Sequence, residues 1–268
     1  MLMKRVSAVV FAALAIFATG AAQGQSSPKP TVTAIEAVEG TFRATLSDGT
    51  LRQGAELTGM ILTYSDGHHT IQIKLNGVRP DPRDETGKLL LHDLRYADTG
   101  NPYCLPSADG LREGYAIPGR ADADGTIHPA EKGAFELACT SGAQGKCLRF
   151  GYRPWAAGPD GVSMQDRYNA CIHMVRADYC GDGTPTTVDG TIIDIFDDAG
   201  IQTPDRGAGF TFEAAWSPEG AVCVAHVRIV ENISLQQLAK TCPRLAGKLG
   251  PSACAEGKVH GDVYNLSK

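Results

Sequence analysis

Eight cysteines constrain the fold of this 268-residue chain more than any other feature of its sequence. They are Cys104, Cys139, Cys147, Cys171, Cys180, Cys223, Cys242 and Cys254. In an exported chain an even number of cysteines indicates disulfides, each of which stabilises a fold by about 2–4 kcal/mol. A structural zinc site is disfavoured because there is no Cys-x-x-Cys pair and no histidine at ligand spacing beside a cysteine pair. The pairing stays open: Cys139 and Cys147 can face each other across a turn or reach elsewhere.

The N-terminus has the organisation of a secretory signal peptide. Lys4 and Arg5 precede an apolar run over residues 6–18, and small residues follow it. Because this run is too short to span a bilayer core of about 30 Å, we predict cleavage after Ala22, with Gly24 as the other option and an uncleaved anchor helix as the alternative. There is no cysteine at the junction and no second long apolar run. We therefore expect an exported protein, periplasmic or extracellular, with no stable membrane anchor after cleavage.

The composition and charge of the mature chain exclude several classes of protein. With 43% hydrophobic and 21% charged residues, it has the balance of a globular protein. Cleavage after Ala22 removes two of the 25 basic residues and none of the 30 acidic ones, so the mature net charge is −7. A nucleic-acid binder needs a basic stripe to neutralise phosphates, and no such cluster exists. We expect no nucleic-acid partner and an unknown partner in the envelope or outside the cell.

The segment between residues 36 and 100 is predicted to be an antiparallel β module, after a flexible leader over residues 23–35 that is polar and contains proline. Hydrophobic residues alternate with a period of two, and Asp-Gly or Asn-Gly pairs supply the positive φ angles of tight hairpins. These pairs begin at Asp48, Asp66 and Asn76. The predicted strands cover residues 40–46, 56–64, 70–75 and 88–96.

A second module is predicted over residues 101–230, followed by a C-terminal helix and tail over residues 231–268. It begins with an irregular connection over residues 101–124. Strands are predicted at 134–140, 146–152 and 191–196, with a hairpin of strands 209–216 and 221–230, and a last helix runs from Ser234 to Pro243. The fold class is therefore α+β, mostly β: an antiparallel N-terminal module, then a disulfide-crosslinked sheet packed with one central helix.

The central helix is predicted over residues 163–180. Ser163 can cap its start, and Gly181 stands where a left-handed C-terminal cap belongs. One arc of the helix is apolar and formed by Met164, Tyr168, Cys171, Ile172, Val175 and Tyr179. The opposite side contains Asn169, His173 and Arg176, which we expect to face away from the core.

Four blocks in the second module resemble the bacterial ADYC-domain family, which is named for the tetrapeptide formed here by Ala177, Asp178, Tyr179 and Cys180. The blocks cover residues 150–155, 170–183, 189–197 and 213–223, so the resemblance extends over residues 101–230. It implies an exported bacterial protein whose domain has no established activity. His173 stands where the resemblance leads us to expect a basic residue, often arginine.

The tetrapeptide has a structural and a catalytic interpretation. In the last turn of the helix, Asp178 faces carbonyl groups that repel a carboxylate, so it needs a partner, with Arg149, Arg153 and Arg176 as candidates. In the structural interpretation, this pair locks the helix onto the sheet and Cys180 is bridged to a strand. In the catalytic interpretation, His173 activates Cys180, but seven helical residues separate them by about 10.5 Å of rise, too far for a hydrogen bond.

A second catalytic interpretation concerns Cys171. The segment over residues 170–174 resembles the His-Gly-Cys signature of L,D-transpeptidases, cysteine enzymes of peptidoglycan cross-linking. It departs from that signature because Asn169 and Ala170 replace the His-Gly pair, and because Cys171 falls on the buried arc of the predicted helix.

Metal and cofactor sites have weaker support in the sequence. An acidic group could bind calcium in an oxidising exterior, but its spacing fits no known loop, and solvent-facing acids next to turns explain it equally well. Its members are Asp182, Asp189, Asp194, Asp197 and Asp198. The histidines that could form a metal site after folding are His68, His69, His128, His226 and His260. No nucleotide-binding or serine-hydrolase motif is present, and we expect no cofactor.

These observations favour a non-enzymatic binding or structural module of the cell envelope or exterior. The alternative is a cell-wall-acting or other hydrolytic enzyme whose site is assembled only on folding.

Overall fold

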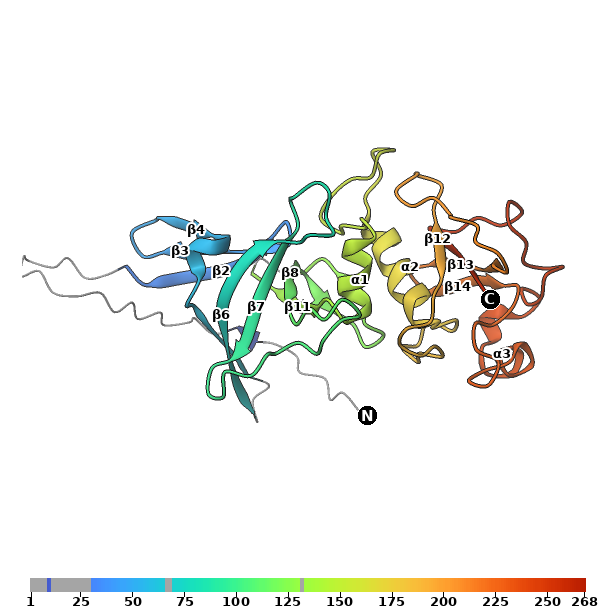
Figure 1. The fold of residues 1–268 in the computed structure, drawn as a ribbon, viewed down its shortest axis with the longest axis horizontal. Helices are drawn as coiled ribbons and strands as arrows, with labels where there is room; N and C mark the ends of the chain where they lie inside the picture. The colour runs from blue at the N-terminus through green and yellow to red at the C-terminus, as the bar shows by residue number, and fades with distance from the viewer. Residues whose placement is uncertain (1–8, 11–29, 66–68, 131–132) are drawn as a thin grey trace, which may run out of the picture. The chain divides into compact units, whose positions relative to one another are not determined.

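The computed structural model describes residues 9–10, 30–65, 69–130 and 133–268, with only the backbone of residues 9 and 10. Apart from these two residues, the predicted signal peptide lies outside the described residues, as do the leader up to residue 29, the predicted turn that begins at Asp66, and His68. The chain divides into two compact units (Figure 1). Unit 1 consists of Met1–Arg120 and Pro129–Ser141, and unit 2 consists of Ala121–His128 and Gly142–Lys268.

Unit 1 consists of two antiparallel sheets. The larger has the strand order β1-β5-β6-β7-β8-β11, and the smaller has the order β2-β3-β4. The strands of the larger sheet are β1 (Val9–Val10), β5 (Ile61–Ser65), β6 (Thr70–Pro80), β7 (Leu90–Tyr96), β8 (Gly114–Pro118) and β11 (Phe135–Cys139). Those of the smaller sheet are β2 (Val32–Val38), β3 (Thr41–Leu46) and β4 (Leu51–Gln53), followed by the 3-10 helix η1 (Gly54–Leu57). Figure 1 shows β6 and β7 as long adjacent strands.

The core of unit 1 follows from alternation along these strands. Leu62 and Tyr64 of β5 are buried, as are Ile73 and Leu75 of β6, because every second side chain points to the same face. They pack with Phe42 of the smaller sheet in one hydrophobic cluster. Burial of each large apolar side chain stabilises the fold by about 1.5–3 kcal/mol.

Several predicted boundaries in unit 1 were wrong. Asn76 and Gly77 do not form a turn: they lie inside β6, where the register with β7 shifts between Leu75 and Gly77 as in a β-bulge. Residues 101–124, predicted to be irregular, contain β8. β2 begins at Val32, within the predicted leader, because it pairs along β3.

Unit 2 combines helices with a four-stranded antiparallel sheet of order β12-β15-β13-β14. Its strands are β12 (Asp194–Phe196), β13 (Thr211–Ser217), β14 (Gly220–Val224) and β15 (Val263–Ser267). The helices are α1 (Ala143–Arg149), α2 (Gln165–Arg176), α3 (Leu235–Thr241) and the 3-10 helix η2 (Pro243–Leu245). The short strands β9 (Arg120–Ala121) and β10 (Ile127–His128) pair with each other. Within unit 2, α2 lies beside α1 (Figure 1). It also contacts the sheet strands β13, β14 and β15.

Contacts with both α1 and the sheet explain why α2 differs from the predicted amphipathic helix. Asn169 and His173, expected on the exposed side, are 1% and 0% exposed. Asn169 is satisfied in the interior because its amide bonds the backbone N–H and C=O of Ile127 at 2.9 Å each. The helix ends at Arg176, and its left-handed cap is Ala177 (φ 49°) rather than Gly181. The N-cap of α2 is Met164 and not Ser163 as predicted, although the hydroxyl of Ser163 accepts a hydrogen bond from the backbone N–H of Gln165 at 3.2 Å.

Three further elements of unit 2 differ from the prediction. The segment over residues 146–152 was predicted as a strand, but its first part belongs to α1. The strand β14 ends at Val224 and not at residue 230, and β15 was not predicted at all. The last helix was correctly placed: Ser234 caps α3, and its hydroxyl accepts from the N–H of Gln237 at 3.2 Å. The predicted fold class, α+β with mostly β, is confirmed.

All eight cysteines form disulfides, as predicted. The pairs are Cys104–Cys139, Cys147–Cys171, Cys180–Cys242 and Cys223–Cys254. The first lies in unit 1 and the other three in unit 2. Cys139 and Cys147 therefore do not pair with each other: Cys147, on α1, faces α2 instead.

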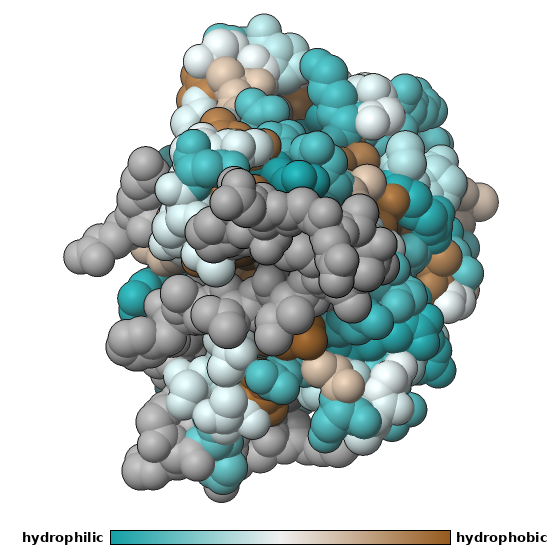
Figure 2. Space-filling view, turned by 90° about the vertical axis from the view of Figure 1, so that its left-hand side faces the viewer, coloured by the Kyte–Doolittle hydropathy of each residue, from teal (hydrophilic) through white to brown (hydrophobic). Residues whose placement is uncertain are grey.

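The surface is mixed in polarity. On the face shown in Figure 2, hydrophobic residues form small separate areas between hydrophilic ones. Among the described residues, no helix combines the length and the apolar composition needed to cross a bilayer.

Candidate functional site

The ADYC tetrapeptide forms the turn that ends α2. Ala177 adopts a left-handed conformation (φ 49°, ψ 41°) although it is not glycine, and its side chain is fully buried. Its N–H donates to the carbonyl of Met174 at 3.1 Å, and the N–H of Asp178 donates to that of His173 at 2.9 Å. These bonds satisfy carbonyl groups that the last turn of a helix leaves free. The chain therefore reverses at Ala177 and carries Asp178 back beneath the helix.

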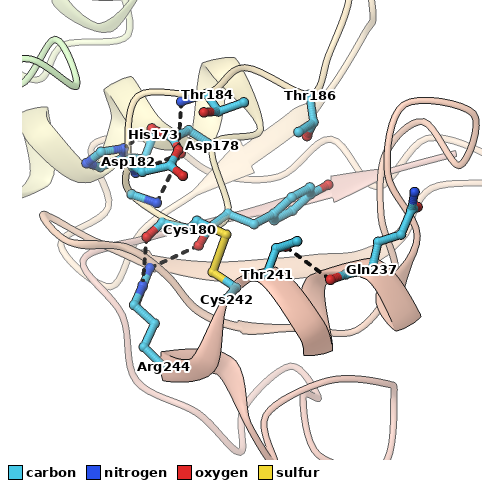
Figure 3. Close-up of a disulfide and its surroundings, with 12 residues drawn as sticks. His173, Asp178, Cys180, Asp182, Thr184, Thr186, Gln237, Thr241, Cys242 and Arg244 are labelled. Carbon is cyan, nitrogen blue, oxygen red and sulfur yellow. Dashed lines mark hydrogen bonds and ion pairs between the residues drawn. A yellow bond between two sulfur atoms is a disulfide. The ribbon is translucent and has the colours of Figure 1, made fainter.

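Asp178 accepts hydrogen bonds from four donors and is fully buried. Its carboxylate lies 2.9 Å from the ring Nδ1 of His173 (Figure 3). It also accepts hydrogen bonds from the backbone N–H groups of Gly181 (3.0 Å), Asp182 (3.2 Å) and Gly183 (2.8 Å). Backbone donors of this kind stabilise an ionised carboxylate. The expected need for a partner was correct.

The partner of Asp178 is His173, and not Arg149, Arg153 or Arg176 as predicted. The reversal at Ala177 is the reason, because it turns the carboxylate toward a ring five residues earlier on α2. Arg176 instead donates to the carbonyls of Asp124 (2.7 Å) and Gly183.

His173 faces acceptors on both ring nitrogens. Nδ1 contacts the carboxylate of Asp178, and Nε2 lies 2.9 Å from the carbonyl oxygen of Pro218. Since neither the carboxylate nor the carbonyl donates, both contacts are hydrogen bonds only when each nitrogen carries a proton. The carboxylate of Asp124 also lies 3.9 Å from Nε2. Burial acts to raise the pKa of Asp124, but hydrogen bonds from Thr126, and then the charge of His173, lower it below its ordinary value.

Tyr179 connects the turn to a buried polar network centred on Glu213. The hydroxyl of Tyr179 donates to Glu213 at 2.9 Å and accepts from the backbone N–H of Arg228 at 2.8 Å. The carboxylate of Glu213 also accepts a hydrogen bond from Asn265 Nδ2 at 2.7 Å. The amide oxygen of Asn265 in turn accepts one from Trp216 Nε1 at 2.8 Å. Burial, and then the charge of Glu213, raise the pKa of Tyr179 well above its ordinary value, so its hydroxyl stays protonated and donates.

Arg228 compensates the charge of Glu213 and also caps α2. Its guanidinium forms two bonds of 3.0 Å with the carboxylate, and it donates to the carbonyls of Met174 (2.8 Å) and Val175 (3.3 Å). Sequence reasoning missed Glu213, Arg228 and Asn265. The signal that could have revealed Glu213 is a charged residue inside the largely apolar strand β13, since such a residue needs a buried partner.

Cys180 is joined to Cys242, the C-cap residue of α3 (Figure 3). We had expected a strand as the partner of Cys180. Arg244 lies beside this bridge: its Nε donates to the carbonyl of Cys180 at 2.9 Å and its Nη2 to that of Tyr179 at 3.0 Å. Burial lowers the pKa of Arg244, and the charges of Glu219 and Asp178 act in the opposite direction.

Two glycines after the tetrapeptide bring other segments into direct contact with it. Gly181 has φ +73°, and a β-carbon there would overlap the carbonyl oxygen of Glu219. Gly183 has φ +85°, and a β-carbon there would lie 2.8 Å from the Cα of Asp124. The turn is therefore packed against the backbone of two segments distant in the sequence.

The weak catalytic candidates occupy structural positions. Cys171 is bonded to Cys147 and Cys180 to Cys242, so neither is a free thiol. His173 contacts Asp178 and Pro218 and is 0% exposed.

Each of the acidic candidates has a hydrogen-bond or ion-pair partner within unit 2, and Asp197 is buried. Asp182 accepts from the N–H of Thr184, Asp189 pairs with Lys146 at 3.4 Å, and Asp194 accepts from the N–H groups of Asp205 and Arg206. Asp197 accepts from the hydroxyl of Tyr152, and Asp198 from that of Tyr264.

The described histidines are also separated. His128 contacts Asp122 at 3.3 Å, His226 bonds Ser267 at 3.0 Å, and His69 and His260 are exposed. Over residues 30–65, 69–130 and 133–268, no group of three or more potential ligands among His, Cys, Asp and Glu could hold a metal ion.

Comparison with known protein families gives one match. The family model of the ADYC domain matches residues 54–230. The match begins at residue 54, in unit 1, whereas the resemblance found in the sequence began only at residue 101. No curated protein and no solved structure matches the chain. Because the family model covers more than half of the chain and includes the tetrapeptide over residues 177–180, the protein belongs to the ADYC-domain family.

Proposed function

We propose that this protein is exported and acts as a non-enzymatic binding or structural module of the bacterial cell envelope or exterior. The observation that carries the proposal is the use of every cysteine in an intramolecular disulfide. Such bridges form and persist in oxidising compartments and are rare in the cytosol. The basic and apolar N-terminal segment has the composition of a signal peptide, which agrees with this compartment.

The state of the ADYC turn supports a structural role for the motif. Asp178 already accepts bonds from four donors, both nitrogens of His173 face acceptors, and Cys180 is bridged. A general base needs a free lone pair directed at substrate, and a nucleophile needs a free thiolate. These side chains use their bonding capacity to hold α2, the sheet and α3 together.

Export is tested by expressing the full chain in a bacterium and identifying the mature N-terminus by mass spectrometry. We expect a chain that begins at Gln23, or at Gln25 if cleavage follows Gly24. Leu14→Arg places a charge in the apolar run and should retain an uncleaved precursor in the cytosol. Ser27→Arg places the same charge beyond the cleavage site and should be exported normally. An uncleaved wild-type chain in the cytosol would refute the proposal.

Compartment and oxidation state are measured on the same material. Osmotic shock releases a periplasmic protein, whereas an extracellular one is found in the medium. Titration under denaturing conditions should detect no free thiol in the exported chain and eight thiols in the Leu14→Arg precursor. Any persistent free thiol in the exported chain would contradict the role assigned to the cysteines.

The hydrolytic alternative is tested with purified peptidoglycan sacculi. A binding or structural module leaves the sacculi intact, whether or not it sediments with them. Release of soluble fragments, absent with heat-denatured protein, would overturn the non-enzymatic assignment.

A further inference from the structure

We propose that the Cys180–Cys242 disulfide is a reduction site, through which an exported dithiol protein or a small dithiol releases α3 from the ADYC turn. This bridge is more accessible than the other two in unit 2. Cys147 and Cys171 are both 0% exposed, and Cys223 and Cys254 are 2% and 1% exposed. Cys180 is partly exposed, although Cys242 is buried.

The guanidinium of Arg244 is placed to favour cleavage of this bridge. It is fixed by hydrogen bonds to the carbonyls of Tyr179 and Cys180, and Arg244 follows Cys242 by two residues (Figure 3). A nearby cation stabilises a thiolate and makes the thiol a better leaving group. The bridge therefore combines a partly exposed cysteine with a positive charge that is bonded to the backbone carbonyl of that cysteine.

The Cys104–Cys139 bridge provides an internal comparison. It also joins a buried cysteine to a partly exposed one. Cys139, however, lies in the β8–β11 ladder opposite Gly114, where backbone hydrogen bonds hold both strands. Reduction of that bridge leaves its strand paired, whereas α3 has no ladder.

Reduction proceeds as an exchange between thiols and a disulfide. A thiolate of the dithiol attacks Sγ of Cys180, the Cys180–Cys242 bond breaks, and Sγ of Cys242 leaves as a thiolate, two residues before Arg244 in the chain. The second thiol of the reductant, as its thiolate, then attacks the mixed disulfide and expels Cys180. The dithiol is oxidised to a disulfide, and its two protons are taken up by the two cysteines.

Reduction of the bridge affects α3 most, because few other contacts hold this helix. It has seven residues, of which only Leu238 is buried. An isolated helix of this length is marginal in water even when, as here, Ser234 and Gln237 form a capping box. Without the covalent bond at its C-cap, we expect α3 to open locally while the rest of unit 2 stays folded.

The experiment uses oxidised, signal-processed protein and dithiothreitol as the dithiol. Native protein is reduced for increasing times, quenched with N-ethylmaleimide and mapped by mass spectrometry. Cys180 and Cys242 should be labelled at least about tenfold faster than Cys104 and Cys139, and the remaining bridges should resist until denaturant is added. A smaller difference, or faster labelling at Cys104 and Cys139, would overturn the proposal.

Variants separate the charge of Arg244 from its role in packing. Arg244→Gln should slow reduction several-fold, Arg244→Lys should keep most of the rate, and Arg206→Gln, at an exposed ion pair elsewhere in unit 2, should have no effect. Equal rates in Arg244→Gln and wild type would refute the contribution of the charge.

Hydrogen exchange tests the release of α3 independently of the rate. Reduction should increase exchange in α3 specifically, and the Cys180→Ser, Cys242→Ser double variant should show the same increase without reductant. Unchanged exchange in α3 would refute its release. Either failure leaves the export proposal intact, since that depends on the oxidised state alone.

Discussion

Glu213 and Arg228 form an ion pair inside unit 2, with Nη2 and Oε1 3.0 Å apart and side chains 0% and 2% exposed. The pair holds the C-terminal end of α2 and the ADYC turn, since Arg228 donates to the carbonyl of Met174 and Glu213 accepts from Tyr179. Tyr179 also stacks on Trp216, with ring centroids 5.3 Å apart. The motif tyrosine thus connects an apolar contact on its face to a charged pair at its hydroxyl.

Removing one partner of this pair should strongly destabilise unit 2. Glu213→Gln leaves the guanidinium of Arg228 buried without its counter-charge, which costs about 3–5 kcal/mol. Glu256→Gln removes the exposed partner of Arg206 and should cost less than about 1 kcal/mol. Both tryptophans, Trp155 and Trp216, lie in unit 2, so urea unfolding followed by tryptophan fluorescence reports on this unit. Similar losses in the two variants would refute the importance of burial.

Two glycines with the same φ angle distinguish backbone strain from close packing. Gly181 and Gly247 both have φ +73°, but only at Gly181 would a β-carbon overlap a backbone atom; Gly247 has no atom within 4 Å of that position. Gly247→Ala should cost about 1–2 kcal/mol, the strain of the left-handed conformation alone. Gly181→Ala should cost clearly more or prevent folding, as measured by the same fluorescence transition. Equal costs would show that Glu219 can move away.

His92 should make unit 1 sensitive to mild acid. It is buried, its Nδ1 donates to the carbonyl of Gly114 (3.2 Å), and its Nε2 accepts from the hydroxyl of Thr41 (3.0 Å). Burial lowers the pKa of His92 from 6.5 to about 4, against the opposing effect of the Gly114 carbonyl.

Between pH 6.5 and 4 the unfolded chain therefore binds a proton at His92 that the folded chain does not. Stability should fall as the pH falls through this window, by about 3 kcal/mol in total. Hydrogen exchange of β7 and β8 as a function of pH measures the effect. His92→Gln should flatten the profile relative to wild type, whereas His128→Gln, at an exposed histidine, should not; a profile unchanged in His92→Gln would contradict the assignment.

One substitution in the β2–β3 hairpin should stabilise unit 1. Glu39 and Gly40, at its turn, both have positive φ angles, of 50° and 84°. Such turns favour Asn-Gly, because asparagine tolerates the left-handed conformation better than glutamate does. Glu39→Asn should slow hydrogen exchange in β2 and β3, because it raises the free energy of opening this hairpin by up to about 1 kcal/mol. Glu85→Asn, at an exposed position without a positive φ, is the control, and no difference between the two variants would contradict the argument.

The sequence predicted elements where a local signal and the tertiary structure agree. Ser234 has a capping box and Pro243 follows α3, so the bounds of this helix could be found from neighbouring residues. The strands β5 and β7 were found from their alternation, because one face of each packs on the core. The first of them was predicted to begin at residue 56, but β5 begins at Ile61 and the 3-10 helix η1 ends at Leu57.

Prediction failed where a distant segment determines the local structure. Asn169 and His173 appeared to be surface residues because a helical wheel does not show that Ile127 and Pro218 satisfy their polar atoms. Likewise, the partner of Asp178 depends on the reversal at Ala177, an uncommon conformation for alanine. Local electrostatics predicts that Asp178 needs a partner, but it does not predict which residue that partner is.

The division of the chain into units affects how parts of it can be produced. Residues 121–128 belong to unit 2 but lie between two segments of unit 1, so the chain passes between the units three times. A fragment beginning at Gly142 lacks Ile127, which is 0% exposed and whose backbone satisfies the amide of Asn169. Expression of unit 2 by simple truncation would thus create a hole and an unsatisfied amide, and a viable fragment would need residues 121–128 reattached through a designed linker.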